Sequence, residues 1–243
     1  MKGEWTERER VILTINLITP IAQNQQGPKP LKSEPSEAAA SARTAKPPER
    51  YIIDKPFYVY EHEVWLRPYQ TPEGREEWEQ MEPQERDNVK EAYLDTFRGP
   101  METALNKVFN EYFEIKHDLK FLNADLAEKY FSFTLDAKAN IKVTDPDDVL
   151  TPSELDYLQE IFSQRATMKE QMHLHARAAM AYVDHNAKTF DGQYKLRLDN
   201  YEHTIDYVEL LTRNPRGEYL WGLEDQVIRR CGARTGPLFE TEA

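Results

Sequence analysis

The sequence predicts an α+β fold, in which a small, mainly antiparallel sheet packs on three or four helices, one of them unusually long. Three observations lead to this prediction. A strong helix start at Thr151 precedes a long stretch that lacks glycine and further proline, strict alternation of apolar and polar residues runs from Phe131 to Val143, and a proline-rich segment separates an N-terminal strand from the rest.

The longest predicted helix spans residues 151–188. It starts with Thr151 as N-cap, Pro152 at the first helical position and Glu154 placed to complete a capping box. At 100° per residue one apolar face forms, made by Leu155, Leu158, Phe162, Ala166, Ala176, Met180 and Val183. Such a helix would be about 50 Å long at 1.5 Å per residue, so we expect it to bend, split or project from a small domain.

Three cationic or titratable residues interrupt that apolar face. Arg165, Lys169 and His173 follow one another at intervals of four and therefore share a side of the predicted helix. Cations are costly to bury without partners, which leaves two interpretations. The row either faces carboxylates of another element or subunit, or forms a solvent-exposed waist between two apolar ends.

The N-terminal part predicts a strand on an arm. Residues 10–20 alternate as a strand does and end at Pro20, with one face formed by Val11, Leu13, Ile15 and Leu17. Residues 22–50 contain five prolines and no aromatic residue, which is typical of a linker or an extended arm. We expect the strand at residues 1–21 either to join the sheet of its own chain or to add to the sheet edge of a partner.

Residues 51–232 are predicted to form the α+β domain. Aromatic and β-branched residues at 51–66 indicate one or two short strands, and the charged run 71–98 indicates helix, with Pro83 restarting it. Gly99 is expected to end that helix and Pro100 to open the next, at a sharp corner. The second helix, to about residue 119, should bury Leu105, Val108, Phe109, Tyr112 and Ile115.

The remaining elements follow from alternation and turn residues. Residues 130–144 predict a strand buried on one side, or a hairpin that turns near Asp136–Asn140. Residues 193–198 predict a short strand, and a helix begins at Asp199. A last helix is expected at 218–231 with Gly232 as its stop, before a tail at 233–243.

Composition limits the classes of partner and the compartment. The formal charge is −12, and because residues 23–50 hold five basic and three acidic residues, the remainder carries −14. Direct nucleic-acid binding is therefore disfavoured, since it requires a concentrated cationic face. Cys231 is the only cysteine, and no apolar run approaches the roughly 20 residues that cross a bilayer. The expected location is the cytoplasm, or a particle assembled there.

Two Glu-x-x-His motifs form the sharpest chemical pattern. Glu114 with His117, and Glu170 with His173, would each place a carboxylate and an imidazole on one helix face, as di-iron bundles require. The segment between the motifs should then supply a further helix with an inward Glu, but it contains the alternating residues 130–144. A metal site therefore remains a weak alternative, and no cofactor is expected.

Other candidate groups have simpler explanations. His185 beside Asp184 could act as a base, but a histidine in a last helical turn also interacts with the helix dipole. Asp145, Asp147 and Asp148 lack the glycine and the distal glutamate of a calcium loop and indicate a turn. The aromatic run at 51–69 could stack on a ligand, although such runs more often form core and interface.

These observations predict a non-enzymatic structural or adaptor subunit of a larger assembly, such as a virion, a tail or a multi-subunit complex. It would dock other protein subunits through the N-terminal arm (Val11, Leu13, Ile15 and Leu17) and through the long helix (Arg165, Lys169 and His173). The alternatives are a metal-dependent enzyme that uses the Glu-x-x-His pairs, and an acidic chaperone or adaptor for a basic client.

Overall fold

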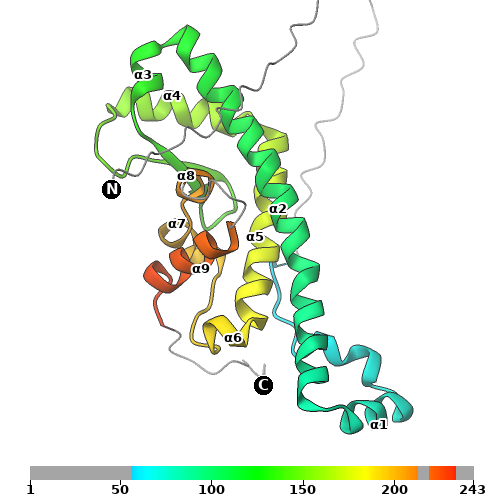
Figure 1. The fold of residues 1–243 in the computed structure, drawn as a ribbon. Coiled ribbons are helices and arrows are strands. Elements are labelled where there is room, and N and C mark those ends of the chain that lie inside the picture. The colour runs from blue at the N-terminus through cyan, green and yellow to red at the C-terminus, as the bar shows by residue number, and fades with distance from the viewer. Residues whose placement is uncertain (1–55, 213–218, 234–243) are drawn as a thin grey trace, which may run out of the picture. The chain divides into compact units, whose positions relative to one another are not determined.

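A computed structural model describes residues 56–212 and 219–233 (Figure 1). The chain divides into two units, Met1–Tyr51 and Ile52–Ala243, and all described residues belong to the second. That unit has the predicted α+β class: a two-stranded antiparallel sheet packs against helices. The predicted strand at 10–20 and the arm at 22–50 lie outside the described residues.

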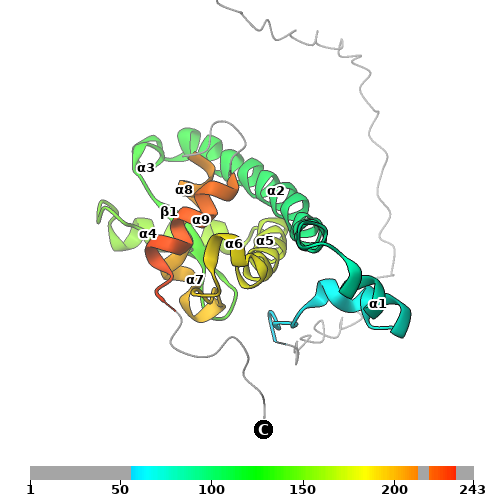
Figure 2. The same ribbon diagram turned by 60° about the horizontal axis from the view of Figure 1, so that its bottom comes forward.

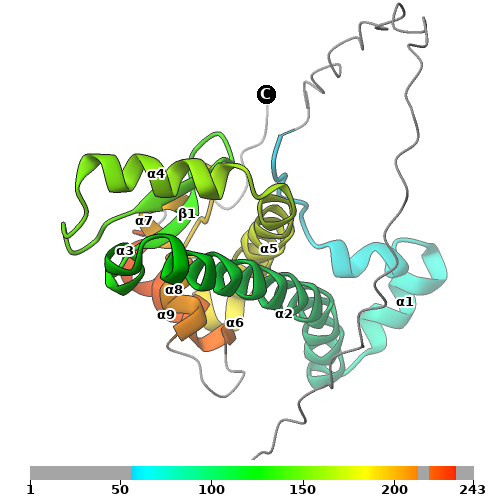
Figure 3. The same ribbon diagram turned by 90° about the horizontal axis from the view of Figure 1, so that it is seen from above.

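The longest helix among the described residues is α2, Pro83–Leu122, and not the predicted helix at 151–188. It follows the short helices η1, Val64–Tyr69, and α1, Pro72–Gln80. The predicted corner at Gly99 and Pro100 is wrong, because α2 continues through both residues. Proline removes one helical hydrogen bond and crowds the preceding turn, which accounts for the bend of α2 visible in Figure 3.

Packing against α5 explains why α2 is not interrupted. α5, Ala166–His185, lies along α2, and the two helices share the most extensive contact in the fold (Figure 1). The buried side of α2 is formed by Leu94, Met101, Ala104, Leu105, Val108, Ile115 and Leu119. Apolar burial on both sides of Pro100 thus outweighs the roughly 3 kcal/mol that a proline costs inside a helix.

The predicted 151–188 helix splits in two. α4, Pro152–Ser163, has the expected capping box, since the Thr151 Oγ1 accepts the Glu154 N–H and the Glu154 carboxylate accepts the Thr151 N–H. The backbone leaves helical geometry at Arg165, whose ψ is 77°. α5 then starts in a different direction (Figure 1), which buries both Phe162 and Met168 completely.

The alternating residues 130–144 form a hairpin, as expected. β1, Ser132–Leu135, pairs with β2, Ile141–Thr144, with Phe133 opposite Val143. The Asp136 carboxylate accepts the N–H groups of Lys138 and Asn140, which closes the turn. β1 is buried on both faces, however, so the one-sided burial expected from alternation is wrong for this strand.

The remaining helices of the described chain are short. They are α3, Ala124–Glu128; α6, Ala187–Phe190; α7, Leu198–Thr204; α8, Tyr207–Thr212; and α9, Tyr219–Arg230. α7 and α8 contact β1, and α9 packs against both of them (Figure 2). Gly232 follows α9 with a φ of 70°, the left-handed conformation expected of a glycine stop.

Two predicted strands are absent from the described residues. Residues 56–61 have no regular secondary structure and pair with neither described strand, residues 62–63 form a turn, and residues 193–197 form an irregular segment that leads into α7. Their aromatic side chains pack on helices instead: the Phe57 ring meets the His173 ring at 5.3 Å. A β-favouring composition reflects half-buried packing as much as ladder formation, which is why it misled here. Within the described chain, no helix is both long and apolar enough for a bilayer crossing.

Candidate functional site

Arg165, the first member of the predicted docking row, faces carboxylates of its own chain. Its guanidinium lies 3.5 Å from Glu111, 3.6 Å from Glu114 and 3.5 Å from Asp118, all on α2. The side chain stays partly exposed, so each of these ion pairs is worth little by itself. The arrangement fixes the start of α5 against α2.

Lys169 and His173, the other two members, hold the tip of the hairpin. The Lys169 Nζ donates to the Asn140 Oδ1 at 2.9 Å, and the His173 Nε2 lies 2.6 Å from the Ala139 carbonyl oxygen. Half-burial lowers the pKa of His173, although the carbonyl opposes that shift. Arg165, Lys169 and His173 therefore all make contacts within the chain, and their role in docking a partner stays a prediction.

The structure does not assemble the two Glu-x-x-His motifs into a metal centre. Glu114 turns to Arg165, His117 lies exposed beside the Phe121 ring, and Glu170 is exposed on α5. Across residues 56–212 and 219–233, no three His, Cys, Asp or Glu side chains are placed to hold a metal ion. The four predicted arm residues, Val11, Leu13, Ile15 and Leu17, lie outside those ranges.

His185 sits in an aromatic enclosure. Its ring stacks on Tyr60 at 5.2 Å and meets the edges of Trp65 at 5.6 Å and Tyr93 at 5.3 Å. Burial lowers its pKa. The neighbouring Asp184 forms an ion pair with Arg197 at 2.8 Å. A catalytic histidine would instead need this carboxylate to orient its imidazole.

A second buried histidine, His175, belongs to the core of the hairpin side. Its Nδ1 lies 3.1 Å from the Tyr207 hydroxyl, and that hydroxyl lies 3.1 Å from the Tyr201 hydroxyl. His175 is fully buried, and desolvation lowers its pKa to about 4. The group has no access for a substrate and acts as a neutral core residue.

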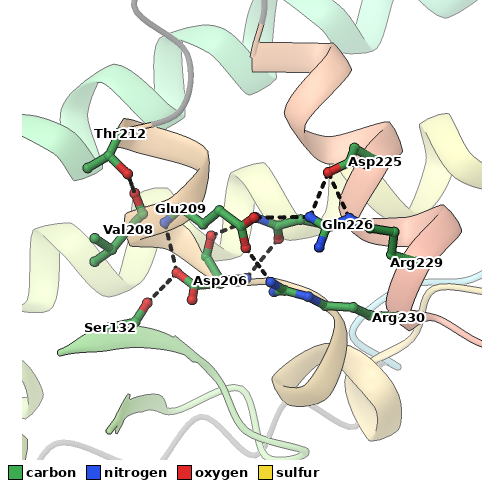
Figure 4. Close-up of polar contacts among 9 residues, drawn as sticks. All are labelled: Ser132, Asp206, Val208, Glu209, Thr212, Asp225, Gln226, Arg229 and Arg230. Atoms are coloured by element: carbon green, nitrogen blue, oxygen red, sulfur yellow. Dashed lines mark hydrogen bonds and ion pairs between the residues drawn. The ribbon is translucent and has the colours of Figure 1, made fainter. Parts of the chain in front are cut away.

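The densest polar cluster of the described chain joins α8, α9 and β1 (Figure 4). The Gln226 side chain accepts the Asp206 N–H at 2.9 Å and donates to the Asp206 carbonyl at 3.1 Å. The Glu209 carboxylate, nearly buried, binds both Arg229 and Arg230. The Asp206 carboxylate caps Glu209 N–H and accepts the Ser132 hydroxyl proton.

This cluster is structural. Its carboxylates point at cations and backbone donors of neighbouring elements, and such mutual satisfaction leaves little capacity for a substrate. Cys231, directly after α9, lacks the lowered thiol pKa of a reactive cysteine. Burial raises the pKa of its thiol, which contacts the Lys195 carbonyl at 3.4 Å.

A cavity of ≈ 820 Å³ lies between residues 58–61, α2 and α5. Its walls are mainly apolar, with Phe97, Pro100 and Ala178 among them, and Glu61, Lys107, Arg177 and His185 also line it. Its size suits a drug-sized ligand. The bend of α2 shapes one wall, because Gly99 and Pro100 both belong to it.

The outward side of α2 carries a row of exposed aromatic side chains. Phe109 is 38% exposed, Phe113 64% and Phe121 78%, and the Phe109 and Phe113 rings contact each other at 5.9 Å between centroids. The prediction that Phe109 is buried is therefore wrong. Phe113 and Phe121 were missed, although the four-residue spacing Phe109–Phe113–His117–Phe121, opposite the buried positions, is visible in the sequence.

Comparison with known proteins finds no matching family model, no similar curated protein and no similar solved structure.

Proposed function

We propose that this chain is a non-enzymatic structural or adaptor subunit that binds other protein subunits and that α2 supplies a docking surface. It would act in the cytoplasm or in a particle assembled there. The observation that carries the proposal is the exposed aromatic row of α2, with Phe113 64% and Phe121 78% exposed.

Exposed aromatic residues are costly in water and favourable in a protein interface. Each phenylalanine offers a large apolar area, and aromatic residues are enriched at the centres of protein interfaces. Single exposed apolar residues are ordinary on a protein surface, but contiguous ones mark interaction sites. The Phe109 and Phe113 rings contact each other and so form one apolar surface, and the Phe121 ring packs on His117 further along the helix.

The polar clusters support a binding role over catalysis. The most concentrated carboxylates and cations among the described residues pair with one another between α8 and α9, and Arg165 pairs with carboxylates of α2. They hold helices in place. The N-terminal strand with Val11, Leu13, Ile15 and Leu17 is proposed as a second docking element, which rests on sequence alone.

Recovery of partner proteins from a lysate of the native source tests the proposal. Tagged full-length protein is compared with Phe113→Asp, and with Val149→Asp as the control, because Val149 is 44% exposed and belongs to the loop before α4. Partners whose recovery falls at least tenfold with Phe113→Asp alone are expected. Equal recovery with all three proteins would remove α2 as a docking surface.

The cavity favours a second function, the binding of a small apolar carboxylate. Its apolar wall would hold a hydrocarbon chain, and Lys107 and Arg177 would attract an acidic head group. Calorimetric titration with decanoate, and with decanol as the uncharged control, tests this function. Binding of decanoate that weakens at least tenfold in Ala178→Trp supports it, and equal affinity for both compounds contradicts the role of the cations.

A further inference from the structure

The exposed face of α2 has a sequence pattern that is complementary to itself. Its members, called here the α2 stripe, are all exposed: Glu102, Asn106, Phe109, Phe113, His117 and Lys120. At 100° per residue, Glu102, Phe109, Phe113 and Lys120 fall within about 40° of one another on the helix surface. They form one narrow line with opposite charges at its two ends and aromatic rings between.

The spacing of this line is symmetric about its centre. Phe109 and Phe113 lie equally far before and after Glu111 in sequence, and so do Glu102 and Lys120. When two α2 helices lie antiparallel with a two-fold axis at that position, Phe109 of one copy meets Phe113 of the other. In the same register, Glu102 of one copy meets Lys120 of the other, about 13 Å from the axis at 1.5 Å per residue.

We propose that the α2 stripe is the interface of a homodimer, in which two copies of the chain pair through antiparallel α2 helices. This inference rests on the proposed use of α2 as a docking surface and names the partner. A two-fold axis repeats each contact, so the interface holds two Phe109–Phe113 contacts and two Glu102–Lys120 ion pairs.

Charge favours this orientation over a parallel pair. Parallel helices in register would place Glu102 against Glu102 and Lys120 against Lys120, two like-charge contacts. The helix dipoles also oppose a parallel arrangement. A two-fold symmetric interface between identical chains requires a surface that is complementary to itself about its midpoint. Binding of an unrelated protein does not require such symmetry.

Among residues 56–212 and 219–233, every member of the stripe stays exposed. α2 buries its opposite side against α5 and lies at one edge of the described fold (Figure 1). That packing holds the backbone of the stripe in place before association. Pairing therefore orders only side chains, which reduces its entropic cost.

Sedimentation of the full-length chain over a concentration series from about 1 to 100 µM tests the proposal. We expect a monomer–dimer equilibrium. Glu102→Lys and Lys120→Glu should each weaken the dimer about tenfold, because each change replaces two attractive contacts by two repulsive ones. The combined Glu102→Lys, Lys120→Glu chain should return to within about threefold of the wild-type dissociation constant, since the charges are exchanged within the same register.

Two control variants carry the same charge changes off the stripe. Glu170→Lys and Lys138→Glu alter exposed side chains on α5 and at the hairpin turn and should leave the dissociation constant unchanged. Phe113→Asp should weaken the dimer about 100-fold or more, because it places a charge at the centre of the interface. Circular dichroism checks that each variant keeps its helix content.

Three results would overturn the inference. The first is a full-length chain that stays monomeric at 100 µM, and the second is a dimer whose affinity does not respond to the charge exchanges. The third is a monomer that dimerises only after Leu13→Asp, which would assign the stripe to the chain's own N-terminal segment. A monomer that still loses other protein partners with Phe113→Asp would refute the homodimer while the proposed docking role of α2 stands.

Discussion

Lowering the pH should destabilise the fold through His175 by an amount that the structure allows us to calculate. The imidazole is fully buried, and desolvation holds its pKa at about 4, against an ordinary value of 6.5. It is therefore neutral in the folded chain at pH 5, whereas the same group in the unfolded chain is mostly protonated. Because the unfolded chain binds more protons, the free energy of unfolding falls as the pH falls from 6.5 towards 4.

The size of the effect follows from the two pKa values. Between pH 7.5 and pH 5, His175 alone should lower the free energy of unfolding by about 2 kcal/mol. The full loss, below pH 4, is about 3 kcal/mol, since each pKa unit corresponds to roughly 1.4 kcal/mol.

Urea unfolding of the wild type and of His175→Gln, followed by circular dichroism, isolates this contribution. Other buried histidines, such as His185, have lowered pKa values and shift both proteins alike. Glutamine keeps a polar group near the Tyr207 hydroxyl but does not titrate. The variant should be less stable than the wild type at pH 7.5, and the difference should shrink by about 2 kcal/mol at pH 5. A difference that stays constant to within about 0.5 kcal/mol would refute the desolvation argument.

Three further predictions concern the backbone of α2, the α8–α9 junction and the N-terminal arm. Gly99→Ala should stabilise the fold by about 0.5–1 kcal/mol in urea unfolding, because a methyl group at this helical position meets nothing within 4 Å; a loss of stability would contradict it. Gln226→Ala should cost about 2–3 kcal/mol, because it leaves the backbone N–H and C=O of Asp206 without their partner; a cost below about 0.5 kcal/mol would show that the pair is replaceable. Deletion of residues 1–50 should abolish assembly with partner subunits but leave the cooperative unfolding of the remainder; a truncated chain that assembles normally would exclude the arm as a docking element.

Local signals in the sequence were sufficient for the start of α4 and for the hairpin. The Thr151–Glu154 capping box and the Asp136 turn each depend on residues within five positions of one another, and both form as predicted. Such contacts do not need knowledge of the fold, so sequence reasoning can find them.

Elements decided by distant contacts were predicted poorly. Residues 56–63 have a strand-like composition, but they pair with neither of the two described strands, and the Phe57 ring packs on α5 instead. The break between α4 and α5 at Arg165 could not be predicted from local sequence, because no proline or glycine is near it. It exists because Arg165 reaches the carboxylates of α2 and because Phe162 and Met168 both enter the core. The carboxylates that Arg165 reaches are 47 or more positions away in sequence, and the burial of Phe162 and Met168 depends on the complete fold.

The two errors made in α2 have a common physical origin, and that origin bears on the function. Burial along α5 carries the helix through Gly99 and Pro100, where local propensity predicts a corner. The same burial uses only one side of α2, so a helix that continues beyond the corner necessarily presents its other side outward. Phe109 and Phe113 lie on that side because the inward positions are already taken by Val108 and Ile115. An aromatic row on a helix fixed by its opposite face is preorganised for binding. The packing that overrides Pro100 therefore also turns Phe109 and Phe113 outward, to the side of α2 where we propose that a second copy of the chain docks.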